Sequence, residues 1–544
     1  MSAPSSNIAT TSSDEKADVC LLLEGTWPYV RGGVSTWVDQ ILTSLPEVKF
    51  AVVFIGADRK ASGAPKYQSP PNLICFRELF LFDPNEPEEI SERSSKATSR
   101  HWSEAHEALR LLVIPDEPAR SEAESDERIA AAFIALSHLA SRVPFLRFWS
   151  HPGTWELLQD VYIRHFEQVS FIDFFWNVRF LAEPVWRLLR LADQLPAASV
   201  YHSVSTGYAG LLGALAARSQ PQTRFLLSEH GIYVRERISE LLRAEWSQQS
   251  QNITTTAASG GIAPLRRLWI DFFIEIGRFT YHSSAAIVSL FQRNADIQAE
   301  FGAPAERIRV IPNGVNLERF DAIRENRRQK RASEADRQIV GFFGRVVAIK
   351  DVKTLLRAAR LVVDILPGAR FLMVGPTDED EAYFQECERL TQELELSKFV
   401  HFGGPATPEQ ALPEFDVMVL SSVSEGLPFS VLEAFASAMP VVSTDVGSCS
   451  ELIHGRSGES PAHGSAGSIV PVGDPAALAK ALVTLLSNRS LQDQCGEAGL
   501  ARARQLYAEP AIIAEYHQLY RELASSQPGA QKPSSISREP ANAS

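Results

Sequence analysis

Cysteine is scarce in this chain, and its spacing fits neither a disulfide framework nor a metal site. Only five cysteines occur among 544 residues, their number is odd, and no two of them form a C-x-x-C pair. This usage argues against structural disulfides and against zinc, and it favours a reducing compartment. We therefore expect a cytoplasmic protein.

Long apolar runs and an excess of positive charge are also missing. No apolar stretch approaches the roughly 20 residues that a membrane-spanning helix needs. The polar segment 1–16 lacks the apolar core of a signal peptide. The formal net charge is -13, which gives no electrostatic support to nucleic-acid binding. There is no Gly-x4-Gly-Lys-Ser/Thr phosphate loop, so the usual NTPase chemistry is excluded. We expect a soluble protein.

What the chain does contain is an alternation of apolar strands with helical segments, which is typical of parallel α/β sheets. With 45% hydrophobic residues it can build two or three cores. Strands are expected at 19–23, 50–55, 199–202, 225–228 and 285–290, and then at 339–343, 370–374, 399–402, 417–420, 441–443 and 468–471. The segment 311–315 has linker composition, so we predict domains at 18–312 and 313–509, a last helix at 510–524, and disordered ends at 1–17 and 525–544.

Residues 83–197 do not follow this alternation and predict a largely helical insertion. Their first part is charged, whereas 145–191 is unusually aromatic. The aromatic residues there are Phe145, Phe148, Trp149, Trp155, Phe166, Phe171, Phe174, Phe175, Trp176, Phe180 and Trp186. They fit either the core of the insertion or a docking patch for a membrane-bound partner, for which Trp149, Phe175 and Trp186 are candidates.

Glu425 and Glu433 frame a predicted strand-to-helix turn. The run 415–422 is typical of a buried strand and 429–438 of a helix. Free backbone N–H groups at the helix start could bind a diphosphate, while the carboxylates could accept hydroxyls of a sugar and a ribose. An isolated pair of this kind is more often solvated or a helix cap. The expected binding residues along the turn are Gly426, Leu427, Pro428, Phe429 and Ser430.

Two further segments place suitable groups beside strand ends. Arg345 follows the strand 339–343 and Lys350 lies five residues later, where both could meet a diphosphate at the mouth of an open α/β sheet. Near the start of the chain, the strand 19–23 leads to Gly32 and Gly33, and a double glycine permits close approach of backbone to ligand.

These motifs together resemble those of retaining GT-B glycosyltransferases of the GT4 family. The resemblance rests on Gly-Gly-Val at 32–34, Asn-Gly-Val at 313–315, Gly344-Arg345 with Lys350, and Glu425-x7-Glu433. The segments 23–37, 201–208 and 229–237 resemble more narrowly the glycosyltransferases of Pel exopolysaccharide synthesis. The likeness runs from about 18 to 523. It implies two Rossmann-like domains facing across a cleft, and a last helix that crosses back onto the first domain.

The resemblance also implies an activity and roles. The enzyme would transfer a hexose with retention from a UDP-sugar, with UDP-glucose favoured, to a growing biofilm polysaccharide. Arg345 and Lys350 would stabilise the departing diphosphate without a metal cofactor. Glu433 would accept the ribose hydroxyls, Glu425 would contact the sugar ring, and His230 would hydrogen-bond the donor sugar. Integral-membrane synthase subunits are the implied partners, recruiting the enzyme to the inner membrane.

Several alternatives stay open. Glu425 could act as a nucleophile in a double displacement, or the reaction could be a front-face substitution. His230 could be a packed strand-end histidine, and His202 could shape the acceptor side. Arg235 and Arg237 are more typical of a solvated helix face than of an anion site.

The segment 378–380, Asp-Glu-Asp, imitates a metal-binding Asp-x-Asp, but we favour helix capping. For the whole protein, the alternatives are a GT-B UDP-sugar epimerase and a nucleotide-sugar sensor or assembly subunit of a synthase complex.

Overall fold

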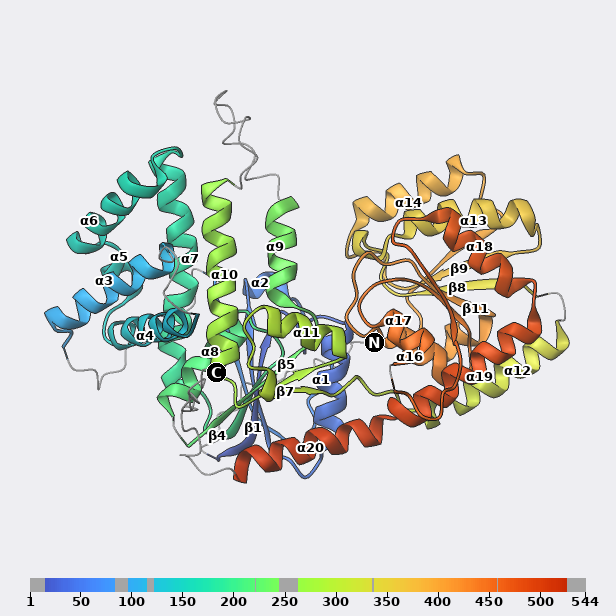
Figure 1. Cartoon of the computed structure of the whole chain (residues 1–544), viewed down its shortest axis with the longest axis horizontal. Coiled ribbons are helices and arrows are strands. Elements are labelled where there is room, and N and C mark those ends of the chain that lie inside the picture. The colour runs from blue at the N-terminus through green and yellow to red at the C-terminus, as the bar shows by residue number, and fades with distance from the viewer. Residues whose placement is uncertain are drawn as a thin grey trace, which may run out of the picture.

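Two parallel β-sheets organise the chain, as the computed structural model shows (Figure 1). The structure describes residues 15–83, 96–114, 122–220, 222–243, 263–334, 337–456 and 458–525. The first sheet has the order β3-β2-β1-β4-β5-β6-β7 and the second the order β10-β9-β8-β11-β12-β13. The predicted two-sheet α/β class is therefore confirmed. The predicted disordered ends fall almost wholly outside the described residues, although Ala17 begins β1.

The first sheet lies in the N-terminal half. Its strands are β1 Ala17–Glu24, β2 Phe50–Gly56, β3 Leu73–Phe80, β4 Ala198–Ser203, β5 Arg224–Glu229, β6 Ala286–Ser289 and β7 Ile308–Val310. The β2 strand is buried along its whole length because helices cover both faces of a parallel sheet. The helices are α1 Gly33–Ser44, α2 Arg59–Ser62, α8 Tyr208–Ser219, α9 Tyr233–Arg243, α10 Pro264–Ser283 and α11 Gln292–Glu300.

The second sheet follows the same plan. Its strands are β8 Ile339–Phe343, β9 Arg370–Val374, β10 Val400–Gly404, β11 Val417–Leu420, β12 Val441–Thr444 and β13 Gly467–Val470. Its helices are α12 Asp321–Ser333, α13 Val352–Ile365, α14 Glu381–Glu393, α15 Pro408–Ala411, α16 Phe429–Ala436, α17 Cys449–His454, α18 Pro475–Leu486 and α19 Arg489–Leu506. Every strand pair of both sheets is parallel, so ligand-facing loops gather at the carboxyl ends of the strands.

The insertion is largely helical in the part of the chain that the structure describes. Its helices are α3 Ser99–Val113, α4 Glu122–Ala140, α5 Phe145–Trp149, α6 Pro152–Val161, a π-helical turn Tyr162–Phe166, and α7 Phe171–Leu191. They lie at the end of the molecule away from the second sheet (Figure 1). Asp126 of α4 accepts hydrogen bonds from Arg278 and His282 of α10 at 2.9 and 2.8 Å, which joins the insertion to the first domain.

Most of the insertion's aromatic side chains belong to a core shared with the first domain. Trp149 and Trp186 are only 7% and 2% exposed, so their prediction as docking residues is wrong. Their rings fill the space between α5 and α7, where Phe145 stacks on Trp149 at 5.5 Å and Phe148 on Trp186 at 4.3 Å. Phe175 is half-buried. The exposed aromatic residues of the set are Trp155, Trp176 and Phe180.

Helix α20 (Glu509–Ser525) crosses back from the second domain and packs beside α1 in the first (Figure 1). Tyr516 and Tyr520 lie in the same core as the apolar side chains of β1 and β2. The Val315 N–H donates to the Tyr507 carbonyl at 2.8 Å, and the Glu509 N–H donates to the Val315 carbonyl at 3.1 Å. The two chain crossings between the domains therefore run side by side.

No helix in the described ranges is long and apolar enough to span a bilayer.

His202 of β4 is a buried structural residue and not an acceptor-side group. Its ring nitrogens are hydrogen-bonded to Tyr520 of α20 and to Ser228 of β5, both at 2.8 Å. Burial, aided by His230, lowers the pKa of His202 to about 3 from its ordinary 6.5. Between about pH 6.5 and pH 3, His202 is therefore protonated in the unfolded chain but stays neutral in the folded protein.

We expect this histidine to make the protein acid-sensitive. The stability that it contributes is complete above pH 6.5 and falls by about 1.4 kcal/mol per pH unit below it. His202→Gln keeps a donor and an acceptor, so it should lower the slope of unfolding free energy between pH 6 and pH 5 by about that amount. Urea unfolding at both pH values measures the slope, with the exposed His401→Gln as control. Equal slopes in wild type and His202→Gln would contradict the assignment.

Candidate active site

Segments from both domains meet at the turn that opens α16. The His230 carbonyl lies so close to Gly426 that any Cβ at position 426 would overlap it. A Cβ at Gly33 would lie 3.7 Å from the ring of Phe429. The Asn313 side-chain amide donates to the Leu427 carbonyl at 3.0 Å. The structure thus brings together motifs that are far apart in the sequence: Gly33 and Gly426 are separated by almost 400 residues.

Residues 447 and 448 hold the turn in place. The Ser448 N–H and hydroxyl donate to the Gly426 carbonyl at 3.0 and 3.1 Å. Gly447 has a φ of +52°, and a Cβ at this position would overlap the carbonyls of residues 425 and 426, so the position favours glycine. Helix α16 begins at Phe429, and its N-cap, Pro428, offers no side-chain cap. The first N–H groups of α16 therefore remain available to a ligand at the positive end of the helix.

Glu425 forms the centre of a buried polar cluster. Its Oε1 accepts hydrogen bonds from the Lys350 ammonium and from the Ser422 hydroxyl, both at 2.5 Å. The Lys350 segment is fastened to the end of β11, because the Val423 N–H donates to the Ile349 carbonyl at 2.9 Å. The predicted cation and carboxylate are therefore direct neighbours. Their side chains are only 16% and 12% exposed.

Arg345 is also paired. Its guanidinium donates to Glu379 at 2.7 Å. Asp380 caps α14 by accepting the Tyr383 N–H at 3.1 Å, so the capping interpretation is confirmed for this residue. The described residues contain no group of three or more His, Cys, Asp and Glu side chains placed to hold a metal ion.

Glu433 lies half-buried on α16. Burial raises the pKa of Glu433 to about 7; Arg319 opposes the shift and Glu409 adds to it. Arg319 is itself bound to Glu409 at 2.6 Å. Within the described residues the Glu433 carboxylate takes part in no hydrogen bond, so it is free to accept hydroxyl groups from a ligand.

His230 follows β5 and is 8% exposed. Trp37 of α1 packs edge-on against its ring at 4.8 Å, and Trp37 also touches His202 and Tyr516. Burial lowers the pKa of His230 to about 3, which keeps the imidazole neutral. Its Nε2 is buried without a hydrogen-bond partner among the described residues. A buried orphan nitrogen is costly unless a ligand group satisfies it.

The remaining residues considered in the sequence analysis differ in their surroundings. Gly32 precedes α1 with open space around its Cα. Leu427 is buried, and Ser430 is half-buried in the first turn of α16. Arg235 is exposed, and Arg237 donates to Glu240 at 2.6 Å, so both fit a helix surface better than an anion site.

Sequence reasoning missed Trp37, Glu24 and Glu229. Tyr233 donates to Glu24 at 3.1 Å, and the fully buried Glu229 accepts from Tyr281 and Gln298 at 2.7 and 3.0 Å. Glu24 ends β1 and Glu229 ends β5, directly before His230, and a carboxylate at a strand end is the signal that could have identified them.

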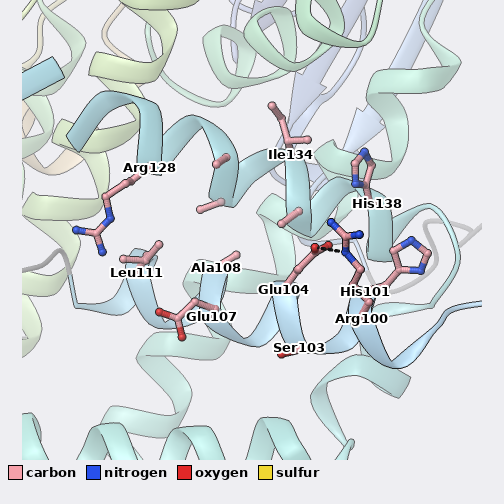
Figure 2. Close-up of a pocket in the computed structure, with 13 residues that line it drawn as sticks. Arg100, His101, Ser103, Glu104, Glu107, Ala108, Leu111, Arg128, Ile134 and His138 are labelled. Atoms are coloured by element: carbon pink, nitrogen blue, oxygen red, sulfur yellow. Dashed lines mark hydrogen bonds and ion pairs between the residues drawn. The ribbon is translucent and has the colours of Figure 1, made fainter. Parts of the chain in front are cut away.

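A groove in the insertion lies apart from these residues (Figure 2). It measures about 880 Å³ between α3 and α4, with a floor that includes Ala108 and Leu111 and a rim that includes Arg100, Glu104 and His138. None of the predicted site residues lines it.

Two known protein families match this chain. Residues 17–306 match a family described as "Domain of unknown function (DUF3492)". The chain belongs to this family. Residues 337–488, which contain Arg345, Lys350, Glu425 and Glu433, match a family described as "Glycosyl transferases group 1". The DUF3492 domain thus contributes Gly33 and His230, and the glycosyltransferase domain contributes the charged residues.

Curated relatives align with less than half of this chain. The D-inositol 3-phosphate glycosyltransferase of Corynebacterium jeikeium is 29% identical over 247 residues, which cover 44% of this chain and 57% of that protein. The putative glycosyltransferase EpsD of Bacillus subtilis is 29% identical over 212 residues, which cover 38% and 52%. The chain spans about half the length of these relatives.

Solved structures match nearly the whole fold. The sucrose-phosphate synthase of Thermosynechococcus elongatus has a TM-score of 0.56 at 18% identity, covering 93% of this chain and 99% of that one. Anabaena HepE, solved in complex with UDP-glucose, has a TM-score of 0.54 at 14% identity, with 93% and 99% coverage. The predicted GT-B fold, with its two α/β domains, is confirmed.

We expect UDP to bind more tightly as the pH rises towards neutrality. In the ribose-binding role expected for Glu433, only the ionised carboxylate accepts both hydroxyls, and its raised pKa of about 7 then requires that binding below neutrality releases a proton. Affinity should rise by up to about tenfold per pH unit below 7 and level off above it.

Isothermal titration between pH 5.5 and 8.5 tests this, with Glu433→Gln titrated in parallel to subtract the ionisation of the UDP phosphate. Parallel profiles for the two proteins would show that Glu433 does not meet the ribose.

Proposed function

We propose that this protein is a retaining hexosyltransferase that moves a hexose from a UDP-sugar, UDP-glucose in the first instance, to a growing exopolysaccharide. One observation carries the proposal: Gly33 and His230 of the first domain lie against the turn 425–429 of the second, beside Lys350. A sugar nucleotide bound there would meet backbone donors, cations and carboxylates at once.

The phosphate end of the donor fits the second domain. The diphosphate would lie at the uncapped start of α16, with Arg345 and Lys350 as counter-charges. Fixed cations of this kind stabilise the negative charge that develops on the leaving oxygen, so we propose that the reaction needs no metal cofactor. Glu433 would accept the ribose hydroxyls.

The sugar would lie between Glu425 and His230. Because Lys350 and Ser422 already hold one oxygen of Glu425, its second oxygen is directed for hydroxyl binding more readily than for attack on carbon. This supports a front-face substitution. The bond from the anomeric carbon to the phosphate oxygen breaks, the acceptor oxygen forms its bond on the same face, and the acceptor proton passes to the leaving phosphate.

The proposed polymer and compartment follow from sequence resemblance and from a structural neighbour. The segments 23–37, 201–208 and 229–237 resemble PelF, the glycosyltransferase of Pel polysaccharide synthesis. HepE, a structural neighbour, was solved with UDP-glucose. We therefore propose a Pel-type exopolysaccharide as acceptor and the cytoplasmic side of the inner membrane as the place of action.

The decisive experiment measures binding and turnover of UDP-glucose with and without EDTA. We expect binding to survive chelation. Arg345→Ala and Lys350→Ala should each weaken UDP binding by about 1.5–3 kcal/mol, since each removes a charge-assisted contact. Arg357→Ala, an exposed cation on α13, is the matched control. Unchanged affinity in both variants, or binding that requires Mg²⁺ or Mn²⁺, would contradict the proposed site.

Product analysis distinguishes the alternatives. Interconversion of the free UDP-sugar without acceptor would identify an epimerase. Tight binding with neither hydrolysis nor transfer to a polysaccharide acceptor would identify a sensor or assembly subunit.

An exposed apolar stripe on α7 supports a membrane partner. Ile172, Trp176 and Phe180 recur every four residues, so they share one helix face, and they are 68%, 46% and 51% exposed. Trp155 of α6 lies nearby, with its ring 5.6 Å from that of Phe171. Exposed aromatic groups of this size are typical anchors of protein interfaces. We propose that an apolar helix of an integral-membrane synthase subunit docks on this α7 stripe.

Trp176→Ser combined with Phe180→Ser should release the enzyme from the membrane fraction of its native cells while the affinity for UDP-glucose stays normal. The control is Ile365→Ser, which removes a 62% exposed apolar side chain from the second domain. Membrane retention of the double variant at the wild-type level would exclude the stripe as the docking surface.

A further inference from the structure

The guanidinium of Arg345 is already occupied by a carboxylate of its own domain. Glu379 accepts its hydrogen bond at 2.7 Å, and the two side chains are 39% and 31% exposed. A diphosphate that uses Arg345 must therefore share or displace Glu379. Lys350 is likewise held by Glu425, but only through Oε1, which leaves the second oxygen of Glu425 for a sugar hydroxyl.

Backbone hydrogen bonds hold together the two loops that carry Arg345 and Glu379, so this ion pair is not a chance surface contact. β8 and β9 are neighbours in the sheet, and the loops that leave them are joined. The Gly344 N–H donates to the Val374 carbonyl, and the Val346 N–H donates to the Pro376 carbonyl, both at 2.9 Å. Gly375 packs directly on the carbonyl of residue 344, where any Cβ would overlap it. The Asp380 cap then fixes the end of the Glu379 loop.

We propose that the Glu379 carboxylate competes with the diphosphate for the guanidinium of Arg345. This competition weakens binding of the UDP product more than binding of the UDP-sugar donor, so Glu379 acts as a positioning residue that favours product release. The inference rests on the proposed function, and it concerns a residue outside the family motifs that the sequence revealed.

The preference for releasing product follows from the charge that transfer creates. When the bond from the anomeric carbon to the phosphate oxygen breaks, that oxygen keeps the electron pair, and the acceptor proton passes to the phosphate and then to water. The terminal phosphate of UDP, with a second pKa near 6, then carries roughly one more negative charge than it did in the UDP-sugar. A fixed carboxylate within one ion-pair distance of Arg345 repels the more highly charged product more strongly.

Glu379→Gln keeps the shape of the side chain and removes its charge. We expect UDP to bind roughly two- to fivefold more tightly to this variant, the range expected for losing one partly exposed competing ion pair. UDP-glucose should gain less. The inhibition constant of UDP should therefore fall relative to the KM for UDP-glucose, while kcat does not rise. A purely structural role for Glu379 would not change this ratio.

The experiment is a double-mutant cycle by isothermal titration with UDP and with UDP-glucose, using wild type, Glu379→Gln, Arg345→Ala and the combination. Removing Arg345 should abolish the gain from Glu379→Gln. Glu381→Gln, at the first position of α14, is the control for loss of a nearby acidic charge and should change neither ligand's affinity. If Glu379→Gln folds poorly, Glu379→Ala, which also removes the carboxylate, should shift UDP affinity in the same direction.

Two results separate the inference from the function on which it rests. Wild type that binds neither UDP nor UDP-glucose would overturn both. The role of Glu379 alone would be overturned if wild type binds both ligands but Glu379→Gln leaves both affinities unchanged. It would also be overturned if Glu379→Gln tightens the binding of both ligands equally.

Discussion

The contact between the His230 carbonyl and Gly426 is the constraint on which the rest of the site depends. Only a residue without a Cβ lets the loop after β5 approach the start of α16 so closely. This approach places the backbone of His230 from one domain against the turn that carries the Glu425 cluster and opens α16 in the other. Each half alone holds an incomplete set of groups, so the domain contact itself assembles the site.

Much of this arrangement was accessible from the sequence because it follows from the ends of strands. Arg345 follows the end of β8 and His230 the end of β5, and each parallel sheet gathers such positions at one edge. Two strands of the first sheet, β3 and β7, were missed because the prediction relied on continuous apolar runs. β3 carries Arg77 and Glu78 and has one neighbour only, and β7 has three residues, so neither produces a continuous apolar run.

Pairing and burial could not be predicted, because they depend on contacts between distant segments. Nothing local indicates that Arg345 meets Glu379 or that Trp37 lies between two histidines. The aromatic residues of α7 illustrate the limit well. Trp186 and Trp176 belong to the same helix, yet 2% of one and 46% of the other is exposed, and helical period alone does not tell which face meets the first domain.

The route of α20 has a consequence for the order in which the protein is made. Tyr516 and Tyr520 complete a core that includes side chains of β1, β2 and α1, and Tyr520 is hydrogen-bonded to the buried imidazole of His202. During synthesis the first domain emerges early, but its core stays open until residues 509–525 have left the ribosome. Domains usually fold one after another from the N-terminus. Here the first domain finishes last, so the apolar face of β1 and β2 must be protected from aggregation while the second domain is being translated.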